Sequence, residues 1–177
     1  MMTPRLPLLL TLLAAHLAQP ALSGIVSTDG HWHAETIAGE LIIASLPDGR
    51  EHHRRALMPQ SGERSATAAL LAHQNPHGVL LALEGAAELW FIALDEDAGP
   101  FHQGFVHSYI AGMEESLASE SGLFARQRIM LEAPLIRLQD EPDEIYILQG
   151  IRTDGTCVRI HLIAKREIGP CPEDPSQ

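Results

Sequence analysis

The stretch Gly78-Val-Leu-Leu-Ala-Leu83, Glu84-Gly-Ala-Ala87, Glu88-Leu-Trp-Phe-Ile-Ala-Leu94 decides the fold class of this chain. Two apolar runs of strand length flank four residues that include a glycine, which is typical of a β-hairpin. Trp90 and Phe91 are large apolar side chains inside the second run. We therefore expect both to pack in the core rather than to form a binding surface.

Two more segments share this plan of strand, tight turn and strand. Their runs cover residues 39–46 with 50–58, and 144–149 with 157–163. An Asp-Gly pair lies in each turn, at Gly49 and Gly155, and this pair accepts the positive φ that a tight hairpin needs. Hairpins that do not alternate with long helices predict an all-β or β-dominated domain of antiparallel, blade-like hairpins, a partial propeller.

Residues 61–73 leave a second architecture open. Their alanines and leucines favour a helix capped by Ser61, although residues 65–71 also have the length of a strand that leads into the second hairpin. The alternative fold is therefore a small β-sandwich with one short helix.

The N-terminus has the pattern of a secretory signal peptide. Arg5 precedes an apolar run at 6–17 that is too short to cross a bilayer as a helix, and small residues stand at Ala21 and Ser23. A buried N-terminal helix or an uncleaved anchor is the competing interpretation. The expected division is a signal peptide at 1–23, a single domain at 24–168 and a proline-rich tail at 169–177, in a periplasmic or secreted protein.

The charge balance excludes two classes of partner. The chain has 12 Lys+Arg against 23 Asp+Glu, a net charge of -11, and loss of Arg5 with the signal peptide makes it more negative. Nucleic acids and anionic lipids need clustered positive charge, so neither is expected as a partner, and no later segment predicts membrane insertion. A protein partner or self-association remains open.

The chain has 2 cysteines, Cys157 and Cys171. In an oxidising compartment two such thiols are expected to pair, which closes a short loop and ties down the tail. Two free thiols or a metal-binding pair are the alternatives, and nothing marks either residue as catalytic.

A longer series of segments resembles the haem-binding β-propellers related to cd-type nitrite reductases and their periplasmic accessory proteins. Asn75-Pro-His-Gly78 is similar to the Pro-His-Gly entry to a propeller blade strand. The other segments that carry the resemblance lie at 88–94, 104–109, 112–114, 124–135, 157–163 and 165–168. The resemblance implies blade strands over about residues 75–168, although a closed propeller typically needs at least four blades.

The resemblance also suggests ligand-binding residues. The haem propellers use histidines as axial ligands and proton donors, which favours His107 first and His77 second. Arg126 and Arg128 would lie on the same side of a strand, where haem propionates suit their guanidinium groups. The alternative for these arginines is an exposed strand face that pairs with the abundant carboxylates. Covalent haem would need a CxxCH motif, which the sequence lacks, so any haem would bind non-covalently.

His31 and His33 stand two residues apart in a chain with 10 histidines. On a strand they would point the same way, and imidazole is a common ligand of copper and zinc. The spacing matches no standard metal signature, so scattered surface histidines are the alternative.

Three hypotheses of function follow. The first is an exported ligand- or partner-binding protein, accessory to a haem or redox pathway of the denitrification type. The second is a structural or protein-interaction module without a cofactor, and the third is a weak copper or zinc binder. No nucleophile, P-loop, dinucleotide or metalloprotease motif occurs, so the sequence does not favour an enzyme.

Overall fold

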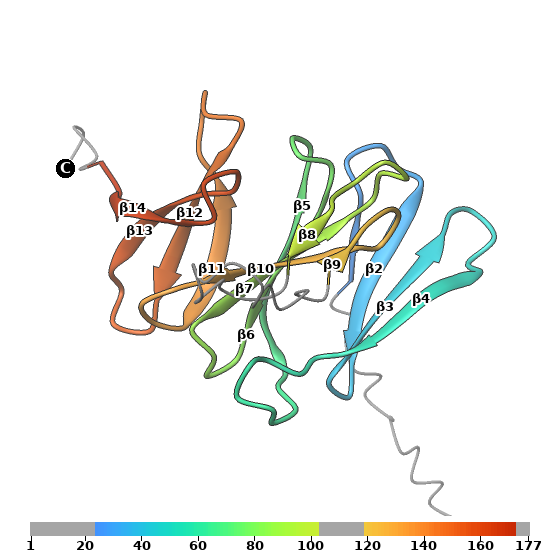
Figure 1. Ribbon diagram of the computed structural model, residues 1–177, viewed down its shortest axis with the longest axis horizontal. Helices are drawn as coiled ribbons and strands as arrows, with labels where there is room; N and C mark the ends of the chain where they lie inside the picture. Colours follow the sequence, from blue (N-terminus) through green and yellow to red (C-terminus); the bar gives the residue numbers. More distant parts are fainter. Residues whose placement is uncertain (1–23, 103–118, 173–177) are drawn as a thin grey trace, which may run out of the picture.

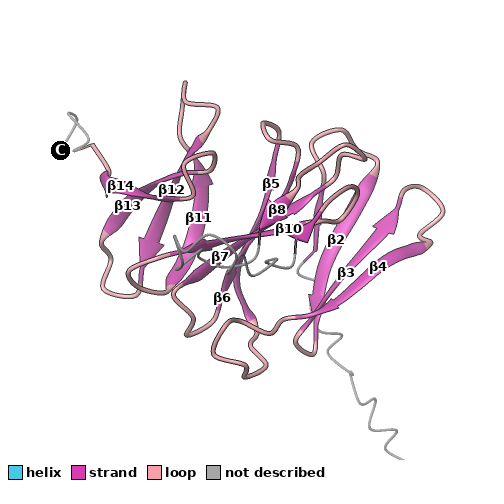
Figure 2. Ribbon diagram, in the orientation of Figure 1, coloured by secondary structure: helices cyan, strands magenta, loops and turns pink. Residues whose placement is uncertain are grey.

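The computed structural model describes residues 24–102 and 119–172 of the chain. Within these ranges the regular structure consists of β-strands, which Figure 2 shows joined by turns and loops. The strands are β1 Gly24–Val26, β2 Trp32–Ile37, β3 Glu40–Ser45, β4 Glu51–Ala56, β5 Thr67–His73, β6 Gly78–Leu83, β7 Glu88–Ala93, β8 Phe101–His102, β9 Ser119–Glu120, β10 Arg126–Met130, β11 Leu135–Asp140, β12 Ile147–Arg152, β13 Cys157–His161 and β14 Arg166–Pro170. No described segment forms a helix able to cross a membrane.

The strands form three four-stranded antiparallel sheets that stand side by side (Figure 1). We call them blade 1 (β1-β2-β3-β4), blade 2 (β5-β6-β7-β10) and blade 3 (β11-β12-β13-β14). A short hairpin, β8 with β9, lies between β7 and β10 along the chain. The prediction of an all-β, blade-like partial propeller is confirmed, and the three-sheet arrangement differs from the alternative two-sheet sandwich.

The first strands of the three blades come together on one side of the molecule. β5 contacts both β1 and β11, whereas β4, β10 and β14 are the last strands of their sheets. Each blade therefore runs outward from a shared inner side, as propeller blades do.

Residues 67–73 form strand β5, so the alternative of a helix over this segment is wrong. Leu70 packs against the core between blades 1 and 2, and its neighbour Leu71 packs against the core between blades 2 and 3. Only an extended chain sends adjacent side chains to opposite faces. Packing on both sides therefore overrides the helix propensity of the alanines and leucines.

Two apolar cores flank blade 2. The core shared with blade 1 contains Leu41, Ile43, Leu81, Trp90 and Ile92, and the core shared with blade 3 contains Leu80, Leu89, Phe91, Leu148 and Ile160. Strands β6 and β7 are consequently buried at every position. The expectation that Trp90 and Phe91 pack in the core agrees with their exposed fractions of 0% and 2%.

Turn geometry and one disulfide fix the ends of the hairpins. Gly49 and Gly155 have φ of 68° and 85°, as the Asp-Gly turns predicted. Cys157 and Cys171 form a disulfide with a Cα–Cα distance of 5.4 Å, which joins β13 to the residues that follow β14. Strand β14 ends at Pro170 and so includes the first two residues of the proline-rich tail.

Candidate functional site

A chain of imidazole and carboxylate groups links blades 1 and 2 at the turns that follow β1 and β5. The Asp29 carboxylate lies 3.2 Å from His31 Nδ1 and 3.5 Å from His77 Nε2. On its other side His77 Nδ1 lies 3.3 Å from Asp95 Oδ1. Burial alone would raise the pKa of Asp29, but the Ser27 hydroxyl, the His31 N–H and the two imidazoles outweigh burial and lower it.

A second histidine links blades 2 and 3. His73 at the end of β5 is only 4% exposed. Its Nδ1 lies 2.7 Å from Asp140 Oδ1 of β11, and its Nε2 lies 2.7 Å from the Asn75 carbonyl oxygen and 3.2 Å from that of Ile145. These contacts tie the end of β5 to β11 and to the turn before β12. The ring lines a cavity of about 240 Å³ with acidic walls, formed in part by Glu141 and Asp143.

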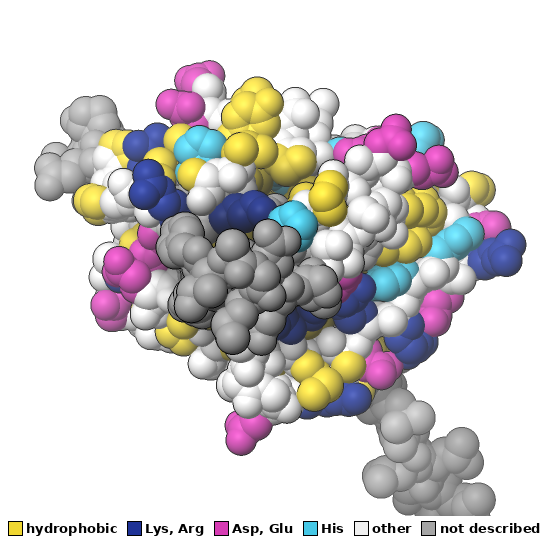
Figure 3. All heavy atoms as spheres, in the orientation of Figure 1, with side chains coloured by type: hydrophobic (Ala, Val, Ile, Leu, Met, Phe, Trp, Pro, Cys, Tyr) yellow, Lys and Arg dark blue, Asp and Glu magenta, His cyan; other side chains and the backbone are white. Residues whose placement is uncertain are grey.

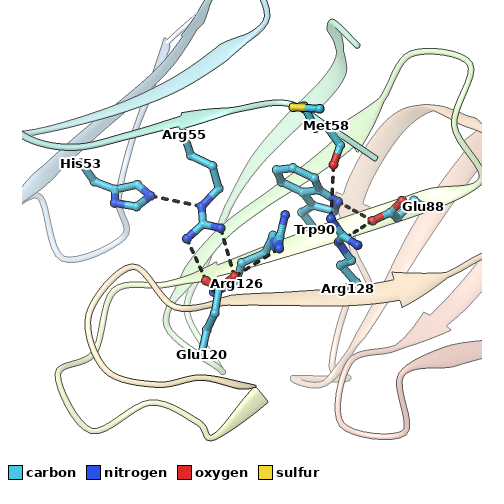
Figure 4. A network of polar contacts seen from close by, with 8 residues as sticks. All are labelled: His53, Arg55, Met58, Glu88, Trp90, Glu120, Arg126 and Arg128. Carbon is cyan, nitrogen blue, oxygen red and sulfur yellow. Dashed lines mark hydrogen bonds and ion pairs between the residues drawn. The ribbon is translucent and has the colours of Figure 1, made fainter. Parts of the chain in front are cut away.

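Buried charges surround the Trp90 ring at the junction of blades 1 and 2 (Figure 4). Glu88 is 2% exposed and accepts hydrogen bonds from Trp90 Nε1 at 2.7 Å and from the Gln60 N–H at 2.9 Å. It also forms an ion pair of 3.0 Å with Arg128. The guanidinium carbons of Arg126 and Arg128 lie 4.6 Å and 5.7 Å from the centroid of the ring. These cation–π contacts and ion pairs hold both arginines, which are partly buried, against the Trp90 ring.

Glu120 of β9 joins the network from its other side. Its two oxygens accept hydrogen bonds of 3.0 Å and 2.7 Å from Arg55 of β4, which is the fork geometry that favours arginine over lysine. It also accepts from the backbone N–H and a guanidinium N–H of Arg126. Burial raises the pKa of Glu120, but these donors together lower it below its ordinary value. Burial, and then the charges of Arg128 and Arg55, lower the pKa of Arg126.

His53 packs at the edge of this network. Its ring stacks on Phe124 at 5.0 Å, and its Nε2 accepts a hydrogen bond of 3.3 Å from Arg55 Nε. Partial burial, followed by the positive charge of Arg55, lowers the pKa of His53, and Glu120 opposes the shift. The neutral form of His53 is therefore favoured in the folded protein.

The residues suggested by the sequence fall into separate places. His107, the first choice for a haem ligand, lies outside the described residues. His77 and His31 share Asp29, whereas His33 lies on the far side of blade 1, where its ring covers Gly24. On the face shown in Figure 3, histidines are spread over the surface rather than gathered at one point. The described residues contain no group of three side chains suited to a metal ion.

The residues offered to a haem do not fit that group in the part of the chain described. Arg126 and Arg128, the partners suggested for propionates, bind Glu120 and Glu88 instead. His77 is held between two aspartates. Two cavities between blades 2 and 3, lined by described residues, measure about 230 Å³ and 240 Å³, below the roughly 300–1,000 Å³ of usual small-molecule sites.

Sequence reasoning did not identify Glu88, Arg55 or Glu120 as members of a network. A signal existed for Glu88, since it opens an apolar run in which every following side chain is buried. A carboxylate at such a position needs buried partners. Arg55 and Glu120 are 65 residues apart, and no local pattern connects them.

No protein-family model matches the chain, and no curated protein matches its sequence. Among solved structures the chain is similar to a dihydro-heme d1 dehydrogenase, NirN, in complex with DHE, with a TM-score of 0.62 and 18% sequence identity. The likeness covers 85% of this chain and 28% of that chain. At this identity the two share a fold, and this chain spans less than a third of the length of the other.

Proposed function

We propose that this chain is an exported protein that binds a protein partner through an exposed sheet face and serves a haem-related redox pathway. The pathway is suggested by the fold shared with a dihydro-heme d1 dehydrogenase and by the sequence resemblance over residues 75–168. Export is suggested by the N-terminal pattern and by the disulfide between Cys157 and Cys171, since such bonds persist in oxidising compartments.

One observation carries the partner-binding role. The outer face of blade 1, which is the side that points away from blade 2, exposes Val26 and Ile37 at 50% and 46%. The opposite side of the same sheet is packed against blade 2 through Ala34, Leu41 and Ile43. A sheet with apolar side chains on both faces can pack against a partner on each face. Blade 2 covers one face of blade 1, and we propose that another protein covers the other.

The histidines and arginines favour this role over direct cofactor binding. His73, His77, Arg126 and Arg128 are held by carboxylates of the same chain. The His73–Asp140 pair joins blade 2 to blade 3, and the His77–Asp29 pair joins blade 2 to blade 1. Arg128 binds Glu88 within blade 2, and Arg126 binds Glu120 of the β8–β9 hairpin. The two histidine pairs help to fix the angles between neighbouring blades.

A photo-crosslinking residue at position 37 tests partner binding in the cell that exports the protein. The variant Ile37→benzoylphenylalanine is expected to give a covalent protein adduct on illumination. The matched control is Glu84→benzoylphenylalanine, at the exposed turn between β6 and β7 of blade 2. Equal labelling at both positions, or none at position 37, would overturn the proposal.

A haem titration of the exported protein tests the competing cofactor role. We expect no saturable one-to-one change in the visible absorption band. A saturable band that disappears in His107→Ala would show that the chain itself binds haem, and would replace partner binding as its primary function.

A further inference from the structure

The two ends of the row of blades expose sheet faces of opposite charge. In blade 1 the core contains Ala34, Leu41 and Ile43, so the residues that alternate with them lie on the outer face. The charged side chains of this face are Glu35, Glu40, Glu51 and Arg54.

Arg54 does not neutralise the outer face of blade 1. Its guanidinium group binds Glu40 at 2.8 Å and Glu51 at 2.7 Å, which leaves an excess of carboxylates on the sheet. Glu35 lies in the middle of β2 and has no ion pair within the described part of the chain. This face is therefore acidic, with Val26 and Ile37 exposed beside the charges.

The outer face of blade 3, which points away from blade 2, has the reverse balance. Leu148, Val158 and Ile160 lie in the core, so Gln149 and Arg159 are on the outer face together with the residues paired across from them. The charged members of this face are Arg137, Arg159, Arg166 and Glu141.

Among the described residues of this face, Glu141 is the carboxylate that opposes these three cations. Glu141 Oε2 lies 3.4 Å from Arg159 Nε and accepts a hydrogen bond of 3.0 Å from Gln149. Arg137 and Arg166 are both exposed. The outer face of blade 3 is therefore basic in a chain whose net charge is -11.

We infer that the partner is a second copy of this chain, and that the outer face of blade 1 in each copy packs on the outer face of blade 3 in the other. This inference rests on the proposed function, because it names the partner of the face already described. In such a pair a residue of blade 1 in one copy contacts a residue of blade 3 in the other and the reverse holds as well, so a two-fold rotation relates the copies and closes the assembly. Two copies with three blades each supply six blades, within the range of about four to eight that propellers use.

Opposite charge and apolar contact have different roles in this contact. The acidic and basic faces attract each other and disfavour the pairing of two like faces, which would place carboxylates against carboxylates or guanidinium groups against each other. The exposed Val26 and Ile37 on one face, and the partly buried Ile151 on the other, lose further exposed apolar area when the faces meet.

Charge reversal on each face tests the inference. Light scattering of the exported protein at roughly 100 µM, where an association with a Kd of about 1 µM is nearly complete, is expected to give twice the mass of one chain. Glu35→Arg and Arg137→Glu should each reduce the mass to that of one chain. The matched controls Glu84→Arg and Arg64→Glu make the same charge changes at exposed positions outside both faces and should retain the doubled mass.

Recombining the variants identifies which faces meet. An equimolar mixture of Glu35→Arg and Arg137→Glu chains should regain the doubled mass, as should a chain that carries both changes, because each then restores opposite charges at every contact. A dimer formed by two blade 1 faces would keep its doubled mass in the Arg137→Glu variant, and that result would overturn the inference. Failure of both the mixture and the double variant to recover would do the same.

A wild-type mass of one chain also overturns the inference, but it leaves partner binding standing if position 37 still crosslinks to a different protein. Loss of crosslinking at position 37 removes the proposed function as well. The two measurements therefore separate failure of the self-association from failure of the partner-binding role.

Discussion

Blade 2 and blade 3 share one strand plan but differ in how their side chains are distributed. In β6 and β7 of blade 2 every residue is buried, because each sheet face packs on a neighbouring blade. In β13 of blade 3 burial alternates from residue to residue, with Val158 and Ile160 in the core and Arg159 on the outer face. An unbroken apolar strand thus marks a blade between two others, and an alternating strand marks a blade at the end of the row.

This difference in burial predicts which blade loses more stability when a large side chain is replaced by alanine. Trp90→Ala in blade 2 should lower the free energy of unfolding by about 3–5 kcal/mol, because it opens a cavity and removes the ring that contacts Arg126 and Arg128. Tyr146→Ala, at the exposed end of blade 3, should cost less than about 1 kcal/mol. Urea unfolding measures both, and similar losses would contradict the distinction between the blades.

Blade 3 is expected to depend on its disulfide in a way that blade 2 does not. The variant Cys157→Ser/Cys171→Ser should lose about 2–4 kcal/mol, since the bond closes a loop with a sequence separation of 14. Hydrogen exchange should accelerate mainly in β13 and β14, while the amides of β6 and β7 remain protected. Uniform acceleration over both blades would show that they unfold as one unit.

The buried carboxylate of blade 2 should give a smaller loss. Glu88→Gln keeps an oxygen for Trp90 Nε1 or the Gln60 N–H but leaves the Arg128 guanidinium without its charged partner. We expect a decrease of about 1–3 kcal/mol in unfolding free energy. Glu132→Gln, at an exposed ion pair with Arg152 of blade 3, is the control and should change stability little. A loss as large for Glu132→Gln would indicate that burial does not set the strength of these pairs.

The smallest expected effect is a pH dependence from His53. Its pKa is lowered from 6.5 in the folded state, so the unfolded chain binds the proton more readily. His53 therefore contributes stability that is fully present above pH 6.5 and is lost as the pH falls through the folded pKa. Unfolding free energies measured from about pH 7.5 down to about pH 5, a range that brackets the ordinary histidine pKa, should fall less steeply in His53→Gln than in the wild type. Identical slopes would show that His53 does not cause the pH dependence of stability.

Sequence patterns predicted the parts of the fold that depend on neighbouring residues. The hairpins around residues 84–87 and the Asp-Gly turns at Gly49 and Gly155 followed from local turn chemistry, and the structure confirms them. The strand at 67–73 remained ambiguous against a helix because its character depends on two cores supplied by other blades. Packing against both neighbouring blades, rather than helix propensity, determines that this segment is a strand.

The networks were less predictable than the strands. Asp29 lies between His31 and His77, and Glu120 binds Arg55, through contacts that only the arrangement of the blades creates. The histidines and arginines were visible as candidate ligands, but their carboxylate partners were not. Residue type therefore indicated which side chains could bind a ligand. The distances in the structure show that most of these side chains bind carboxylates of the same chain.

The small hairpin between β7 and β10 has a consequence for how this chain can change. Phe101 pairs with Glu120 and His102 pairs with Ser119, while Phe124 and Ala93 are joined by a backbone hydrogen bond of 2.9 Å. The two ends of the sequence at 103–118 are thus clamped before blade 2 resumes at β10. Lengthening a connection whose two ends are already held together costs little, about 0.6 kcal/mol for each doubling of its length. We therefore expect insertions between residues 102 and 119 to leave the pairing of β7 with β10 in place.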